Sequence, residues 1–225
     1  SNTARSSSNF YALNNGIATL FEIRGVGIGK TSFKRRINSG LAVGFSFLKT
    51  AYENSNFIFN QIDIANTYTN DIVLQHERSI YTDVIKAIDI ESNELIDFST
   101  TMHSSKDSYA ISKRDRPLAY IIKKNNYGFI EKLNDVGVNY VELEKDTMIY
   151  SGGYKVVEFN NKFKVYEKMK MQKVVTSIEY NNNKFSKGDI LISMNQKRSN
   201  LIAELLEPEA PNSYVSFGII KTSLN

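Results

Sequence analysis

The spacing of apolar residues changes near residue 70, and this change divides the chain into two parts. Between residues 33 and 48 apolar residues recur every three or four positions, which is the period of an amphipathic helix. From Asp71 onwards apolar and polar residues alternate, as they do in strands that expose one face. We therefore predict an α/β part over residues 1–70 and a β-rich part of mixed α+β character over residues 71–225.

The first part is expected to hold one strand and two helices. Residues 17–23 form a short apolar run with a single charge, which is typical of a buried strand. Three glycines within residues 25–29 give a flexible connection, and Thr31 or Ser32 can cap the long helix that follows and runs to about residue 52. A second helix is expected over residues 56–68. The polar N-terminus, with Arg5 and three serines after it, is expected to be disordered.

The second part is expected to contain several strands, two short helices and turns rich in asparagine. The expected strands cover residues 84–90, 95–98, 117–123 and 190–194. The expected helices cover residues 127–134, ended by Gly137, and 199–206, ended by Pro208. Further β-rich segments fill residues 154–180, with turns at Asn160–Asn161 and Asn181–Asn183.

Composition excludes several classes of function. The 28 basic and 24 acidic residues are spread along the chain, so the formal charge of +4 forms no one-sided patch and we expect no nucleic-acid partner. The chain has no cysteine, which rules out disulfides, thiolate metal sites and a cysteine nucleophile. No apolar run approaches the roughly 18 residues needed to cross a bilayer, so we expect no membrane partner. The 41% of hydrophobic residues is sufficient for a core.

The most informative stretch runs from Phe21 to Arg36, with the sequence FEIRGVGIGKTSFKRR. A carboxylate near the end of a strand, then a glycine-rich loop and a helix, is the arrangement in which open α/β sheets carry reactive groups. Apolar residues on both sides of Glu22 would partly remove it from water, which suits a general base. Alternatively, Glu22 forms a purely structural ion pair with Arg24, two residues further on the same face of the strand.

This stretch resembles the end of the catalytic domain in carboxypeptidase A-type zinc peptidases, in its large bacterial branch. The resemblance is carried by Asn15-Gly16-Ile17, by Phe21-Glu22-Ile23-Arg24, by the glycines at 25, 27 and 29, and by Phe33-Lys34-Arg35-Arg36. It implies that Glu22 is the general base and that Arg24 helps to hold the local geometry. It also implies that the complete protein hydrolyses C-terminal peptide bonds of a peptide substrate and uses zinc.

The second part is similar to the extra C-terminal region that follows the catalytic domain in large bacterial members of the family. The similar segments are residues 116–122, Leu133, residues 136–138, residues 199–208 and residues 213–217. The resemblance therefore implies two units, the C-terminal portion of a peptidase catalytic domain over residues 1–70 and an accessory domain over residues 71–225. It is compatible with a periplasmic or secreted location for the complete protein.

The zinc ligands of this family are a His-x-x-Glu motif and a later histidine, all ahead of the catalytic glutamate. Here only 21 residues precede Glu22, and both histidines, His76 and His103, follow it. The residues three positions after them are Ser79 and Lys106, so neither makes the motif. We therefore expect no metal or other cofactor on this chain, zinc ligands upstream in the complete protein, and no activity from this chain alone.

Two other functions stay open. The chain could be a non-catalytic binding or structural module of a peptidase-like protein. The residues Gly29-Lys30-Thr31 also match the end of a phosphate-binding loop motif, although that motif requires a glycine at the position of Arg24. Finally, residues 162–173 alternate lysine with apolar residues, which is typical of a half-exposed strand and would also suit an acidic polymer.

Overall fold

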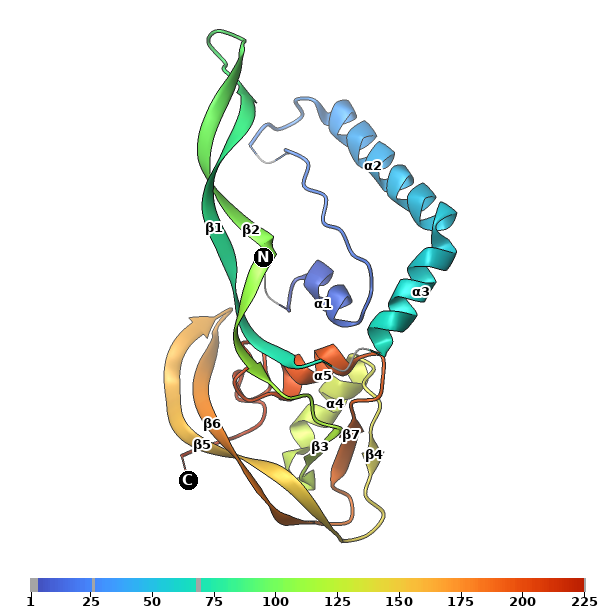
Figure 1. Cartoon of the computed structure of the whole chain (residues 1–225), viewed down its shortest axis with the longest axis vertical. Coiled ribbons are helices and arrows are strands. Elements are labelled where there is room, and N and C mark those ends of the chain that lie inside the picture. The colour runs from blue at the N-terminus through green and yellow to red at the C-terminus, as the bar shows by residue number, and fades with distance from the viewer. Residues whose placement is uncertain (1–3, 26, 68–69, 225) are drawn as a thin grey trace.

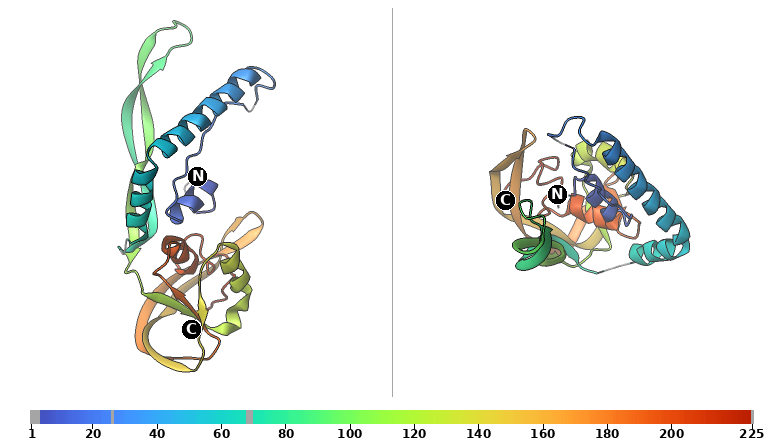
Figure 2. Two further views of the ribbon diagram at one scale, coloured as in Figure 1. Left: turned by 90° about the vertical axis from the view of Figure 1, so that its right-hand side faces the viewer. Right: turned by 90° about the horizontal axis from the view of Figure 1, so that it is seen from above.

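A computed structural model describes residues 4–25, 27–67 and 70–224 of the chain. It consists of a small body, two long hairpins and an N-terminal arm that projects from the body alongside the first hairpin (Figure 1). The left view of Figure 2 shows that the arm and this hairpin extend in the same general direction. Helices and antiparallel sheets are both present, which confirms the mixed α and β character that the sequence predicts.

The body is built on a three-stranded antiparallel sheet with β7 at its centre. β7 (Ile190–Ser193) pairs with β3 (Ala119–Ile122) on one side and with β4 (Val141–Glu142) on the other. Ile190 and Ile192 lie two residues apart and so project from the same face of the sheet into the core cluster, where both are fully buried. The predictions of a strand near residue 190 and of one near residue 120 are both confirmed.

Helices close the core of the body. A short 3-10 helix, η1 (Lys124–Phe129), leads into α4 (Ile130–Asp135), and α5 (Ser199–Leu206) matches its predicted bounds. Gly137 follows α4 with a φ of +66°, a conformation that favours glycine. The core cluster draws mainly on the segments in which the sequence resemblance to the accessory region lies; among its members are Tyr120, Leu133, Val138, Ile202, Leu206 and Tyr214.

The first hairpin consists of β1 (Ile72–Ile88) and β2 (Leu95–Arg114). The sequence predicted only the outer halves of these strands, over residues 84–90 and 95–98. The inner halves were missed because polar residues interrupt the alternation there, and the pairing itself shifts register three times between Val73 and Ser79. The Asp89 side chain closes the tip by accepting hydrogen bonds from the backbone and hydroxyl of Ser92.

The second hairpin consists of β5 (Thr147–Tyr166) and β6 (Met169–Phe185), which form a separate two-stranded sheet. Its turn lies at Glu167 and Lys168, both with positive φ, so the two predicted asparagine turns are wrong. Asn160–Asn161 lies within β5 at a register shift, and Asn181–Asn183 lies within β6. β6 accommodates Asn183 because its side-chain amide donates hydrogen bonds to the backbone and hydroxyl oxygens of Ser151 across the hairpin.

The arm contains α1 (Ser7–Leu13), an extended segment, α2 (Phe33–Glu53) and α3 (Ser55–Asn66). Both long helices were predicted; residue 68, the expected end of the second, lies outside the described residues. Residues 7–13 form α1, so the predicted disorder of this segment is wrong, and α1 lies against α5 of the body. Asn14 and Asn15 at its end hydrogen-bond to Arg198 and Asn200 of the body, which fixes the base of the arm.

Residues 17–23 do not form the predicted strand. They are extended, but within the described residues no neighbouring strand pairs with them. A strand is defined by hydrogen bonds to a partner, so an apolar run alone could not settle this prediction.

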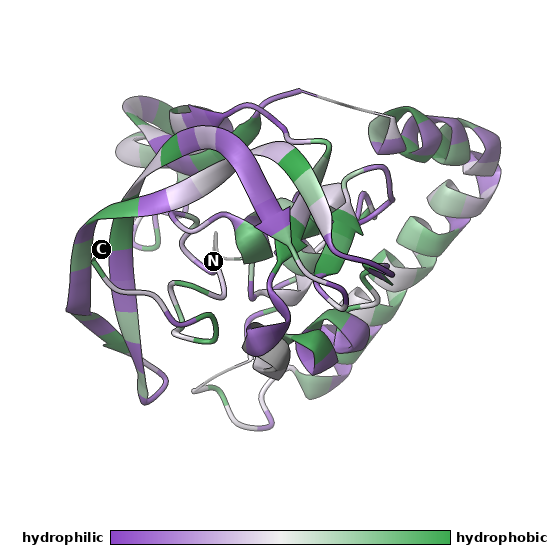
Figure 3. Ribbon diagram, turned by 90° about the horizontal axis from the view of Figure 1, so that it is seen from below, coloured by the Kyte–Doolittle hydropathy of each residue, from purple (hydrophilic) through white to green (hydrophobic). Residues whose placement is uncertain are grey.

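α2 and α3 have no buried residues, and Figure 3 shows hydrophobic and hydrophilic residues mixed along both helices. In the described part of the chain no helix is long and apolar enough to span a membrane.

Candidate functional site

The segment that carries Glu22 packs against α2 through the residues on either side of it. The rings of Phe21 and Phe47 meet edge to face, with their centres 6.1 Å apart. Ile23 lies beside Gly40 of α2, since a Cβ atom on Gly40 would lie 3.4 Å from Cδ1 of Ile23, at van der Waals contact. Phe47 and the backbone at Gly40 of α2 therefore hold Phe21 and Ile23 in place, although both side chains stay partly exposed.

This packing determines where the carboxylate points. Side chains alternate along an extended segment, so Glu22 and Arg24 project to the side opposite Phe21 and Ile23. Both are exposed. Among the described residues no ion pair joins Glu22 to Arg24, so the structural pair that the sequence left open is not observed. The carboxylate is available to a ligand on its side of the segment.

Arg36 organises the glycine-rich loop between Glu22 and α2. Its Nη2 atom donates a hydrogen bond of 2.7 Å to the carbonyl oxygen of Gly29, and its guanidinium lies over the ring of Phe33. A Cβ on Gly25 would lie only 2.5 Å from Nη1 of Arg36, so a side chain at this position would require the end of the Arg36 side chain to shift. Ser32 begins α2 as predicted, but its side chain makes no capping hydrogen bond. Val26, in the middle of this motif, lies outside the described residues.

The described residues do not fit a catalytic zinc site. They include no group of three or more His, Cys, Asp or Glu side chains that could hold a metal ion. His76 lies on β1 and His103 on β2, and neither belongs to the segment that carries Glu22. The residues around Glu22 supply a carboxylate, a guanidinium and backbone groups, so no catalytic step through a metal can be derived from them.

A second constellation, which the sequence did not predict, surrounds Glu207 in the body. This glutamate is fully buried and directly follows α5. One of its oxygens accepts hydrogen bonds from the hydroxyls of Tyr120 and Tyr154, and the other lies 2.8 Å from Nη1 of Arg114. A glutamate between an apolar helix and Pro208 was the available signal, since such a position is buried and a buried charge requires partners.

The electrostatics of this constellation favour a structural role. Burial, and then the charge of Glu207, raise the pKa of both tyrosine hydroxyls, so Tyr120 and Tyr154 stay protonated and donate. Burial alone would lower the pKa of Arg114, but the adjacent carboxylates outweigh it and raise the pKa. Every oxygen of Glu207 therefore has a partner, and four segments of the chain meet at one charge. A saturated network of this kind anchors a fold and offers no free group to a substrate.

Comparison with known proteins relates the chain to carboxypeptidases. No family model matches the chain, and no solved structure matches it. The chain is 28% identical over 224 residues to carboxypeptidase 2 of Trichophyton tonsurans, and this match covers 98% of this chain and 42% of that protein. It is 29% identical over 229 residues to carboxypeptidase 2 of Trichophyton equinum, with the same coverage. With carboxypeptidase 2 of Trichophyton rubrum it shares 29% identity over 226 residues, or 96% of this chain and 41% of that protein.

These relatives are fungal, and the matches run through both the arm and the β-rich part. The chain spans about two fifths of the length of the curated relatives that it matches. The similarity is thus to a part of a carboxypeptidase, and it extends over nearly the whole of this chain.

Proposed function

We propose that this chain is part of a zinc-dependent carboxypeptidase of the carboxypeptidase A type and that Glu22 is the general base of that enzyme. The observation that carries the proposal is the presentation of Glu22, which is exposed on the side of its segment opposite α2 while its neighbours are held against the helix. The carboxypeptidase names of the relatives support it independently. Membership of the bacterial branch stays a prediction, since the relatives reported above are fungal.

In this proposal Glu22 moves one proton. Its carboxylate accepts a proton from the water that attacks the scissile carbonyl carbon, and the resulting acid gives the proton to the leaving amine nitrogen. Arg24 lies on the same side two residues further on and acts as a positioning residue that helps to hold the local geometry of the segment. The zinc ligands are expected from sequence outside this chain, and this chain alone is expected to be inactive.

The complete protein with Glu22→Gln tests the proposal. The amide keeps the size of the side chain but cannot accept the proton, so turnover of a peptide with a free C-terminus should fall by roughly 10²–10⁴ while the KM changes little. Zinc content should be unchanged. Asp63→Asn, at an exposed carboxylate of α3, is the matched control and should keep the wild-type rate. A folded, zinc-loaded Glu22→Gln enzyme with the wild-type rate would show that Glu22 is structural.

The alternative function is a non-catalytic binding module, and one observation favours it for the β-rich part. The polar groups of the body around Glu207 are saturated, whereas in a cavity lined by the two hairpins Lys164 and Lys173 form no ion pair with any carboxylate of the described residues. This alternative concerns residues 71–225 and is compatible with a catalytic role for Glu22 in the arm.

A further inference from the structure

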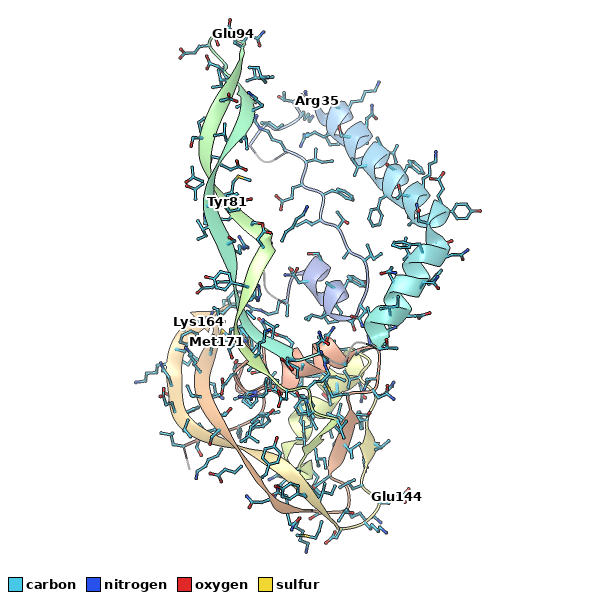
Figure 4. The ribbon with its side chains drawn as sticks, in the orientation of Figure 1. Arg35, Tyr81, Glu94, Glu144, Lys164 and Met171 are labelled. Atoms are coloured by element: carbon cyan, nitrogen blue, oxygen red, sulfur yellow. The ribbon has the colours of Figure 1, made fainter. Side chains whose placement is uncertain are left out.

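Both long hairpins line one cavity of about 810 Å³, which we call the inter-hairpin groove. β1 and β2 contribute His76, Ile80, His103 and Ile111. β5 and β6 contribute Phe163, Lys164, Met171 and Lys173. Figure 4 shows Lys164 and Met171 close together near the turn of the β5–β6 hairpin. The volume falls within the range of roughly 300–1,000 Å³ that is usual for ligand sites.

Two cations of the groove are held over one aromatic ring. Nζ of Lys164 lies 5.4 Å, and Nζ of Lys173 lies 5.7 Å, from the centre of the Phe163 ring. Within the described residues neither lysine forms an ion pair with a carboxylate. The ring orients both ammonium groups without neutralising them, so they remain able to bind an anion.

The carboxylates of the groove, in contrast, already have partners. Glu77 accepts a hydrogen bond of 3.0 Å from the hydroxyl of Tyr109. Glu209 accepts hydrogen bonds from Arg114 and from both the backbone and the hydroxyl of Thr176. These hydrogen bonds do not remove the charge of the two carboxylates, but the lining carries three basic side chains, Arg78, Lys164 and Lys173, so its formal charge is still positive.

The remaining walls are largely apolar, with Ile80, Ile111, Met171 and Pro211 among them. Among the described residues of the lining Phe163 is the one Phe, Tyr or Trp, and its ring is already contacted by lysines, which does not suit the stacking of successive bases. A ligand that satisfies both the cations and the apolar walls must combine carboxylates with apolar side chains. An extended polypeptide segment has this combination.

We propose that the inter-hairpin groove binds an acidic, partly apolar segment of a polypeptide. In the complete protein, and resting on the proposed function, this segment belongs to the substrate chain, which the groove holds away from the bond that is cut. The electrostatic match also steers such a segment towards the groove before it binds.

Fluorescence anisotropy of this chain with a short labelled peptide of alternating glutamate and leucine tests the proposal. The peptide should bind, and added salt should weaken the binding. Lys164→Glu/Lys173→Glu should weaken binding by about tenfold, because two attractive contacts become repulsive. Lys168→Glu/Lys170→Glu changes the net charge equally on the same hairpin but outside the groove lining, and should weaken binding by less than about threefold. Urea unfolding checks that both variants are folded.

Three outcomes would overturn the proposal. Equal losses in the two double variants would mean that only the overall charge matters. Equal binding of a lysine–leucine peptide would remove the requirement for carboxylates, and stronger competition by heparin or duplex DNA would indicate a general polyanion site. The result is independent of Glu22→Gln, since the anisotropy experiment measures binding to this chain alone and no hydrolysis.

Discussion

Nη1 of Arg114 lies 2.8 Å from Oε2 of Glu207, and this ion pair joins the end of β2 to the residue after α5, 93 positions away. Arg114→Met should lower the free energy of unfolding by about 3–5 kcal/mol, because it leaves a buried carboxylate without its cation. The measurement is urea unfolding at neutral pH. Lys155→Met is the control: its ion pair with Glu179 is half exposed, so its loss should change stability by less than about 1 kcal/mol. Equal effects of the two variants would contradict the structural role of the Glu207 network.

The same network predicts a loss of stability in alkali. The pKa values of Tyr120 and Tyr154 are raised in the folded state, whereas unfolding returns them to about 10. The folded state therefore keeps protons that the unfolded state releases, and stability falls as the pH rises above about 10. Urea unfolding across this range should show the decline in the wild type and a shallower decline in Tyr120→Phe. Tyr52→Phe, at an exposed position on α2, should leave the slope unchanged.

Gly137 should resist substitution. Its φ is +66°, and a Cβ there would lie 2.9 Å from Nη2 of Arg198. Gly137→Ala should therefore lower the free energy of unfolding by about 1–2 kcal/mol. Gly44→Ala is the contrasting change, because it lies inside α2 with open space around it and should be neutral or stabilise by up to about 1 kcal/mol. Differential scanning calorimetry of both variants measures the two effects, and a neutral Gly137→Ala would be the contrary result.

This chain alone should bind no zinc tightly, since the described residues offer no group of three suitable ligands. Dialysis against zinc followed by metal analysis should give well below one zinc per chain. One tightly held zinc, lost in His76→Ala or His103→Ala, would show that the histidines form a site with groups that sequence spacing did not identify.

Local patterns predicted the elements that carry their own signal. The sequence predicted α2, α5 and β7 correctly, because their apolar periodicity and the proline that ends α5, Pro208, are properties of neighbouring residues. Residues 17–23 were misassigned because a strand depends on a partner elsewhere. The turn at Glu167 and Lys168 was missed because neither residue type is typical of positive φ. The turns were predicted instead at the asparagines nearby, which adopt such conformations more often.

In the candidate site, too, the features with a local sequence signal were predicted and those that depend on distant residues were not. Glu22 and Arg24 could be proposed from sequence, because a carboxylate beside a glycine-rich loop is a local motif. The packing of Phe21 and Ile23 on α2, which directs Glu22 outwards, depends on Gly40 and Phe47 from a later segment. The Glu207 network was beyond sequence reasoning, since its donors are 53 to 93 residues away and only folding brings them together.

The hydrogen bond between Nδ2 of Asn15 and Oδ1 of Asn66 closes the arm on itself, because these residues stand at its departure from the body and at its return. The described residues between Asn15 and Asn66, with Glu22 among them, therefore form one loop that is closed at its base. The pivot of the arm would lie at this base, where Arg198 donates hydrogen bonds to Asn14 on the arm and to the carbonyl oxygen of Gly137 on the body. α2 is about 30 Å long, so a slight rotation at this pivot becomes a displacement of several ångströms at the far end. The contacts of Arg198 therefore bear on the position of the whole arm relative to the body, while packing on α2 sets the direction of the carboxylate.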